Sequence, residues 1–148
     1  MKSVILGFIL LSSAALKAQD LESTKQKFIG DYELVNYVTF GEDGTERDMH
    51  YIGRLSYDRF DNMAGLGMPI DLPSRAENSS EPTIGGFGYW GKVSWDLEAG
   101  TVTHHVVGSP MVPQWVGGDN VRYFEFLEDD LLALSIKNSQ GRITGTLT

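Results

Sequence analysis

The sequence predicts an all-β protein: an eight-stranded up-and-down β-barrel preceded by a short N-terminal helix or turn. Three observations carry this prediction. Beyond residue 30, apolar and polar residues alternate with a period of two. About eight such runs follow one another, and turns rich in Gly, Asp and Asn separate them at hairpin spacing. The stretch 89–126 is rich in aromatic residues, and an aromatic meander of this kind builds a barrel with a few polar groups inside.

The first 18 residues have the layout of a secretory signal. Lys2 is followed by the apolar run 4–11, by small residues, and by a plausible cleavage point after Ala18. The apolar run is too short for an ordinary membrane span. We therefore expect 1–18 to be removed and 19–148 to form one barrel domain that is exported, periplasmic or secreted, and not inserted into a membrane. An N-terminal anchor that is never cleaved is the alternative.

Composition narrows the possible partners. Without Lys2 and Lys17, the 12 Lys and Arg residues become 10 against 20 Asp and Glu, so the exported chain carries a net charge of −10. An acidic surface repels phosphate backbones and anionic lipid, which argues against nucleic acid and membrane surfaces as partners. The chain has no Cys, so an exported domain must be held by packing alone, which favours a closed barrel. The sequence leaves the oligomeric state open.

The domain is expected to begin with a helix or turn at 21–28, because Asp20 is a good helix N-cap. A first strand then covers 32–40. The turn after it uses Asp43 and Gly44, because Asp bonds nearby backbone and Gly tolerates positive φ. Alternation along the first strand places five side chains toward the core: Tyr32, Leu34, Asn36, Val38 and Phe40.

A second strand is expected at 48–58, with Leu55 and Tyr57 on the inward face. A third, interrupted by Gly, follows near 62–68. Residues 69–82 contain three prolines and little periodicity, so we expect a long surface loop that covers one mouth of the barrel.

The second half of the chain continues as a meander. Its expected strands are 87–96, 101–108, 119–127, 131–136 and a last strand from Arg142 onward. Gly-, Asp- or Pro-containing segments connect them at 98–100, 109–118, 128–130 and 138–141. Helical periodicity is nearly absent from this half, which completes the all-β prediction.

Several blocks resemble the lipocalin-like domain family. Residues 28–35 (FIGDYELV) look like its opening Gly-x-Trp-x-Leu-Val strand, with Tyr32 in the place of the Trp. Residues 53–57 and 62–64 resemble its next hairpin. The later half of the family is matched by 89–91, 100–106 and, most specifically, 113–123. The segment after Met68 is short beside the family's helix-containing insertion, and the family continues beyond the position of Thr148 into a Trp-x-Arg strand. The resemblance implies a barrel with a ligand cavity, and a fold alone does not assign a function.

His104 and His105 are adjacent, and adjacent residues of a strand point to opposite faces. They cannot both bind one metal ion from a regular strand, His50 is expected to face outward, and no Cys is present. We therefore expect no metal site and no cofactor. His104 shares its face with Val102 and Val106, which places it inside. It is either a core histidine bonded to a Tyr or a carbonyl group, or a ligand contact.

Arg122 shares a face with Phe124 and Phe126, so its guanidinium is expected inside an apolar barrel, where it needs a partner. A stacked, hydrogen-bonded arginine that orders the barrel is favoured over an anchor for a ligand carboxylate or enolate, because lone buried charges are rarely left unpaired. Trp115 lies in a loop rich in Pro and Gly, and either covers the cavity mouth or fastens the loop to the core.

Known catalytic patterns are missing from the sequence. It contains no Gly-x-Ser-x-Gly elbow, phosphate-binding loop or dinucleotide fingerprint. Residues 78–80 (Asn-Ser-Ser) match an N-glycosylation acceptor, which matters only in a secreted eukaryotic protein.

The expected function is binding of a small hydrophobic or amphiphilic molecule with one polar or anionic group inside the barrel. Asn36, His104 and Arg122 would orient this ligand, and Trp115 would cover the entrance. The apolar wall would consist of Leu34, Val38, Leu55, Tyr57, Tyr89 and Val106. Binding is favoured over catalysis. The alternatives are an isomerase or cyclase, in which His104 is the acid–base and Arg122 stabilises an enolate, and a structural exported domain whose interior is filled.

Overall fold

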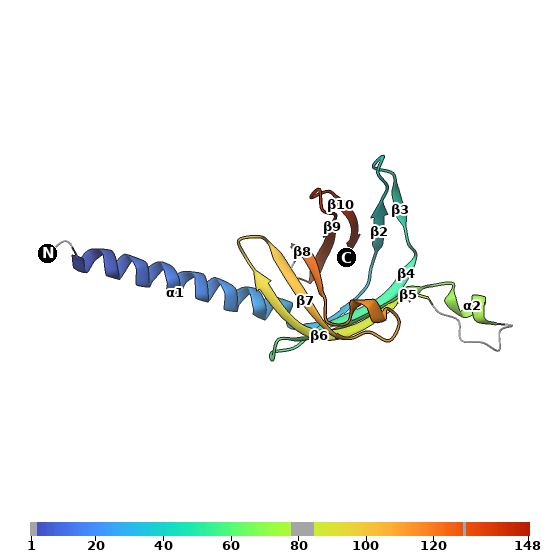
Figure 1. Cartoon of the computed structure of the whole chain (residues 1–148), viewed down its shortest axis with the longest axis horizontal. Coiled ribbons are helices and arrows are strands. Elements are labelled where there is room, and N and C mark those ends of the chain that lie inside the picture. Colours follow the sequence, from blue (N-terminus) through green and yellow to red (C-terminus); the bar gives the residue numbers. More distant parts are fainter. Residues whose placement is uncertain (1–2, 78–84, 129) are drawn as a thin grey trace.

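The computed structural model describes residues 3–77, 85–128 and 130–148 (Figure 1). Most of this part is antiparallel β-structure, and its ten strands belong to one sheet in the order β1-β4-β5-β6-β7-β8-β9-β10-β2-β3. The strands are β1 (Gly30–Glu33), β2 (Tyr37–Phe40), β3 (Glu46–Asp48), β4 (Tyr51–Tyr57), β5 (Asn62–Pro69), β6 (Phe87–Asp96), β7 (Thr101–Gly108), β8 (Asp119–Glu128), β9 (Leu131–Lys137) and β10 (Ile143–Leu147). The helices are α1 (Ser3–Phe28), α2 (Leu72–Ala76) and the 3₁₀ turn η1 (Pro113–Trp115). The all-β prediction is confirmed.

The expected count of eight strands is wrong, because two expected strands are each broken. The first breaks between β1 and β2, where the amides of Val35 and Asn36 both donate to the carbonyl of Thr148 at 2.7 and 3.1 Å. The second breaks between β3 and β4 at His50, whose φ is +50°. The Asp48 carboxylate accepts a 2.8 Å hydrogen bond from the His50 amide and stabilises this left-handed residue.

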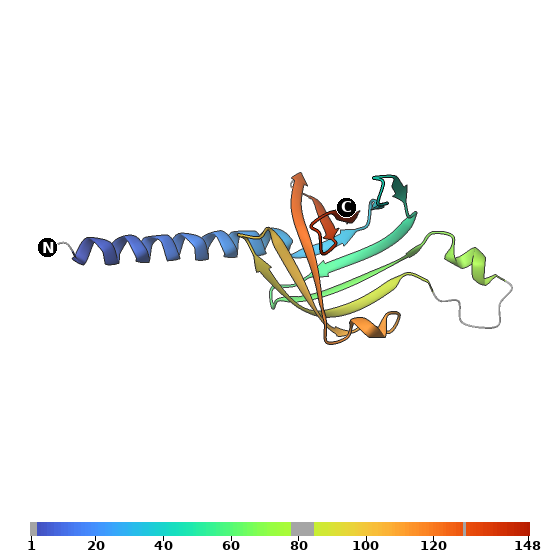
Figure 2. The ribbon, with the colours of Figure 1, turned by 45° about the horizontal axis from the view of Figure 1, so that its top comes forward.

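The sheet curls so that its two ends approach each other at the β1–β2 break. The Leu34 amide donates to the carbonyl of Gly53 in β4, and the Val35 amide donates to the carbonyl of Thr148, directly after β10. Neighbouring residues therefore contact strands from opposite ends of the strand order. Figure 2 shows the strands curving around a common interior. The architecture is a curled, barrel-like antiparallel sheet.

α1 is longer than the expected N-terminal helix or turn, and it projects from the sheet as one rod (Figure 1). Asp20 does not cap it, because the residues on both sides of Asp20 are good helix formers and no Gly or Pro stops the helix there. The helix ends at Phe28, and the Tyr32 hydroxyl donates to the carbonyls of Lys27 and Phe28 at 2.9 and 3.1 Å. In the described part of the chain, no helix has the length and apolar character needed to cross a membrane.

The segment expected to be an irregular loop at 69–82 contains a helix, so that prediction is wrong in part. Pro69 belongs to β5, and α2 then forms over five residues with Pro73 in its first turn, where the missing amide costs nothing. Arg75 pairs with Asp71 at 2.7 Å, which holds this turn. The glycosylation motif at 78–80 lies outside the described residues.

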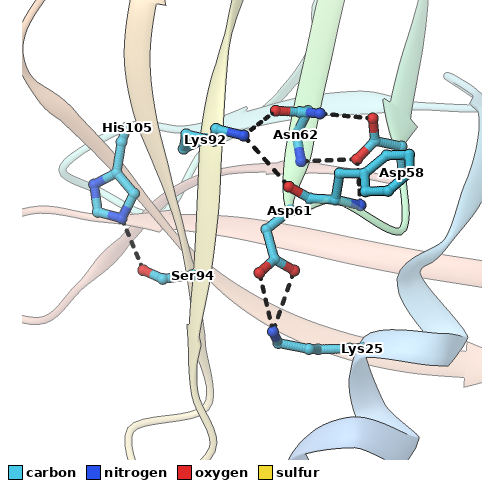
Figure 3. A network of polar contacts seen from close by, with 8 residues as sticks. Lys25, Asp58, Asp61, Asn62, Lys92, Ser94 and His105 are labelled. Atoms are coloured by element: carbon cyan, nitrogen blue, oxygen red, sulfur yellow. Dashed lines mark hydrogen bonds and ion pairs between the residues drawn. The ribbon is translucent and has the colours of Figure 1, made fainter.

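Phe28 is the centre of an aromatic cluster inside the curled sheet. Its ring is fully buried and packs mainly edge-on against the rings of Tyr57, Trp95, Phe124 and Phe126, with centroids 5.1–5.6 Å apart. These five residues are called the Phe28 cluster below. The Lys25 ammonium meets Asp61 at 3.1 Å and fastens α1 to the β4–β5 turn (Figure 3). The last turns of α1 thus contribute to the core of the domain.

Candidate functional site

The interior beyond the Phe28 cluster encloses a cavity of about 620 Å³. This volume lies within the range of small-molecule sites, roughly 300–1,000 Å³. Most of the wall is apolar and comes from six strands or their ends: Leu34, Tyr37, Leu55, Phe87, Leu132, Leu134, Ile136 and Leu147. A cavity of this kind favours a ligand that is largely apolar.

Tyr89 on β6, His104 on β7 and Arg122 on β8 contribute polar side chains to the same cavity. Charged side chains also line it: Lys27, Asp31, Glu33, Arg54 and Asp130. These strands are direct neighbours in the sheet, and His104 is opposite Val93 of β6 and Asn120 of β8. Tyr89, His104 and Arg122 form one polar section of the wall, while β9 and β10 supply apolar side chains. The charged wall residues lie outside this section and are exposed.

His104 lies between two tyrosines. Its Nε2 is 2.7 Å from the Tyr57 hydroxyl and its Nδ1 is 2.8 Å from the Tyr89 hydroxyl. The His104 side chain is 1% exposed. Burial, then the positive charges of Arg122 and His105, lower the pKa of His104 from 6.5 to about 3. The imidazole is therefore neutral at physiological pH, with one donor nitrogen and one acceptor nitrogen.

The two tyrosines differ in their access to the cavity. Tyr57 is buried in the Phe28 cluster and does not line the cavity, whereas Tyr89 does. Burial raises the pKa of both hydroxyls, and the charge of Arg122 opposes this rise at Tyr89. Both hydroxyls keep their protons at neutral pH. Because each His104 nitrogen already has a tyrosine partner, Tyr89 is the member of this set that is placed to contact a bound molecule directly.

Arg122 is half-buried at the cavity wall. Its Nη1 donates to the carbonyl of Val121 at 3.0 Å. Within the described ranges no carboxylate lies within 4 Å of its guanidinium. The bond to a carbonyl group fits the expected hydrogen-bonded structural arginine, and the anchor for a ligand stays a prediction that rests on the place of Arg122 at the cavity wall.

Trp115 ends η1 and lines the cavity. Its ring meets Tyr89 edge-on with centroids 5.4 Å apart and lies 6.4 Å from Phe87. The indole thus extends from the loop that contains η1 and packs against two side chains of the cavity wall. Since it contacts Tyr89, its position is coupled to the polar section of the cavity.

Some expected site residues lie elsewhere. Asn36 is exposed and does not line the cavity, because the β1–β2 break ends the alternation on which its inward placement depended, and Tyr37 faces the cavity instead. Val38, Tyr57 and Val106 are buried without lining it. The sequence analysis missed several wall residues: Tyr37, Phe87, Leu132, Leu134, Ile136 and Leu147. The alternation of Leu132, Leu134 and Ile136 was a readable signal for three of them.

His105 faces the opposite side of β7 from His104 and belongs to a second polar cluster. Its Nε2 is 2.8 Å from the Ser94 hydroxyl, as Figure 3 shows, and its Nδ1 is 2.7 Å from Asp119. The order of contacts is that of a serine hydrolase triad, but none of the three residues lines the cavity and all are partly or well exposed. An exposed serine on a regular strand has no enclosed pocket for a substrate. The cluster cross-links β6, β7 and β8 on the outer face.

Among the described residues, no group of three His, Cys, Asp or Glu side chains is arranged to hold a metal ion. Comparison with known proteins finds no relative: no family model matches the chain, and no curated protein matches it in sequence. The geometry of the cavity is therefore the basis for the functional proposal.

Proposed function

We propose that this protein is an exported, lipocalin-like β-barrel that binds a small, mostly apolar molecule with one polar or anionic group inside the barrel. The observation that carries the proposal is the cavity of about 620 Å³, whose wall is mostly apolar and includes the polar side chains of Tyr89, His104 and Arg122 on neighbouring strands. Burial of an apolar ligand supplies most of the affinity, at roughly 25 cal/mol for each Å² removed from water. The few polar groups supply orientation.

Export and the family relationship belong to the same proposal. The motif at residues 1–18 supports removal of a signal, after which the last turns of α1, including Phe28, would remain with the barrel. Ten strands in one curled antiparallel sheet support a barrel of the lipocalin-like type. The binding role follows from the cavity rather than from this likeness.

Native mass spectrometry of the protein purified from its own host tests the proposal most directly. We expect a retained small molecule that is released on unfolding. A protein that carries no retained molecule from its host and binds no apolar dye would overturn the proposal.

A matched pair of variants locates the binding in the cavity. Ile136→Trp adds an indole to the cavity wall and is expected to weaken binding of an apolar fluorescent dye such as N-phenyl-1-naphthylamine at least tenfold. Val121→Trp adds the same ring at an exposed position outside the cavity and should leave binding unchanged. Circular dichroism and the melting temperature show whether both variants fold. Equal dye binding by the two folded variants would place the dye outside the cavity.

A further inference from the structure

The polar section of the cavity differs from an ordinary polar patch in that it offers donors without acceptors. We infer that it selects a carboxylate, which accepts a hydrogen bond from the Tyr89 hydroxyl and pairs with the Arg122 guanidinium, while Tyr57 and His104 hold the Tyr89 proton in position. This inference rests on the proposed binding function and names the chemical class of the ligand's polar group.

The direction of the hydrogen bonds follows from Tyr57. A neutral His104 donates from one nitrogen and accepts at the other, so one tyrosine must donate to it and the other must accept from it. Tyr57 is 3% exposed, and the 2.7 Å contact with His104 Nε2 is the one hydrogen bond that its hydroxyl makes within residues 3–77, 85–128 and 130–148. If Tyr57 accepted from Nε2, its own buried proton would have no acceptor, which costs the desolvation of that group. Tyr57 therefore donates to Nε2.

The hydrogen bond from Tyr57 also fixes the direction of the hydrogen bond between His104 and Tyr89. With Nε2 accepting, Nδ1 carries the proton and donates to the Tyr89 oxygen 2.8 Å away. The Tyr89 proton is then directed away from His104, and Tyr89 lines the cavity. A ligand acceptor at this point receives a hydrogen bond from a hydroxyl whose oxygen is already polarised by a second donor. Such chains of hydrogen bonds strengthen one another.

Arg122 supplies the charge. Arg122 lines the same cavity as Tyr89 and His104, and its strand β8 pairs directly with β7, which carries His104. The acidic residues that also line the cavity are exposed, and no described ion pair joins them to Arg122: Asp31, Glu33 and Asp130. A hydroxyl donor beside a guanidinium without a counter-ion matches a carboxylate, which accepts from both. An ammonium group at Tyr89 would be repelled by the like charge of Arg122, and the carboxylates of the cavity wall are exposed to water.

Ligands with the same chain and different head groups test this inference. Dodecanoate, dodecanol and dodecylamine are titrated against the full-length protein at pH 7.5, with displacement of the apolar dye as the readout. We expect dodecanoate to bind about 10- to 100-fold more tightly than dodecanol, and dodecylamine to bind most weakly. Equal affinities for the acid and the alcohol would overturn the inference and leave the proposed function intact. Failure of all three ligands and of the dye to bind would overturn the proposed function itself.

Single substitutions test the contribution of each residue to carboxylate binding. Arg122→Met should abolish the preference for dodecanoate while dodecanol binds as before, and Arg122→Lys should restore part of the preference. Tyr89→Phe should weaken dodecanoate about tenfold. Tyr57→Phe should weaken it too, although Tyr57 does not line the cavity, because Nε2 loses its donor and Nδ1 can then accept the Tyr89 proton. Tyr123→Phe, on a residue outside the cavity wall, is the control.

A spectroscopic measurement tests the positioning role without relying on variants. Long-range ¹H–¹⁵N correlation in the folded protein reports which His104 nitrogen carries the proton. We expect protonated Nδ1 and unprotonated Nε2 in the wild type, and a shift toward protonated Nε2 in Tyr57→Phe. A protonated Nε2 in the wild type would overturn the inferred direction of the hydrogen bonds.

Discussion

The Phe28 cluster and the cavity are built from the same strands, yet one is filled by protein and the other encloses about 620 Å³. On β4, Tyr57 belongs to the cluster and Leu55 to the cavity wall; on β8, Phe124 and Phe126 belong to the cluster and Arg122 to the wall. The strands alone therefore do not decide what occupies the interior. The difference is the ring of Phe28, which α1 inserts among four other aromatic rings.

The Phe28 cluster and the cavity are linked by the hydrogen bond between the Tyr57 hydroxyl and His104. Within the cluster, the Tyr57 hydroxyl points to His104, whose other nitrogen faces Tyr89 at the cavity. Tyr57 in the packed cluster thus fixes one end of the chain of hydrogen bonds from Tyr57 through His104 to Tyr89, and Tyr89 at the other end lines the cavity. We expect mutations in the cluster to change mainly stability, except at Tyr57, which is linked to the cavity through His104, and mutations at the cavity to change mainly binding.

The largest expected effect is a loss of stability from a substitution in the Phe28 cluster. Phe28→Ala removes a fully buried ring and should lower the free energy of unfolding by about 3–5 kcal/mol, measured by urea denaturation. The control Phe60→Ala removes a ring that is 63% exposed and should cost less than about 1 kcal/mol. Equal losses in the two variants would show that α1 does not contribute to the core.

The second effect depends on pH and tests the link between the two regions. The pKa of His104 falls from 6.5 in the unfolded chain to about 3 in the folded one, so between these values the unfolded state binds one more proton. Stability should therefore fall by roughly 1 kcal/mol for each pH unit of acidification from pH 6.5 to about pH 3, and this contribution should be constant above pH 6.5.

His104→Gln should flatten that part of the pH dependence, whereas His105→Gln on the outer face should leave it in place. Should the first variant not fold, an NMR titration of the wild type gives the same information, because the His104 ring signals should not titrate between pH 8 and about pH 4. Titration of His104 near pH 6.5 would contradict the buried, neutral imidazole.

Substitution of Trp115 at the cavity wall is expected to change stability less than Phe28→Ala does, and to change mainly binding. Trp115→Ala removes an edge-on contact with Tyr89 and should lower the free energy of unfolding by about 1 kcal/mol, less than Phe28→Ala does. Release of the bound dye, followed by stopped-flow fluorescence, should become about tenfold faster. The control is Trp90→Ala, which removes a half-exposed indole outside the cavity wall. Unchanged release would leave Trp115 with a packing role alone.

The smallest effect concerns the contact between α1 and the β4–β5 turn. The Lys25–Asp61 pair is partly exposed and should contribute about 0–1 kcal/mol, decreasing with added salt. A double-mutant cycle with Lys25→Ala and Asp61→Asn measures it, and Asn is chosen because Asp61 has a φ of +58°, which Asn tolerates. A coupling above about 2 kcal/mol would mean that the ion pair, and not Phe28, fastens α1.

Much of the fold could be predicted from local patterns. Period-two alternation predicted the strands from β5 to β9 within a few residues, and the opposite faces of His104 and His105 follow from the same rule. The inward placement of Arg122 with Phe124 was likewise a local consequence of strand geometry. The number of strands, the length of α1 and the position of Asn36 could not be predicted in this way.

By itself, the sequence determined the β-rich class and which face of each regular strand turns inward, because these depend on residues next to one another. Only the tertiary structure decided where strands break, since the amide of Val35 finds Thr148 from the far end of the chain. It also decided which inward residues are packed and which line the cavity. Tyr57 and Tyr89 are both buried inward tyrosines, but Tyr57 packs against Phe28 and does not line the cavity, whereas Tyr89 does.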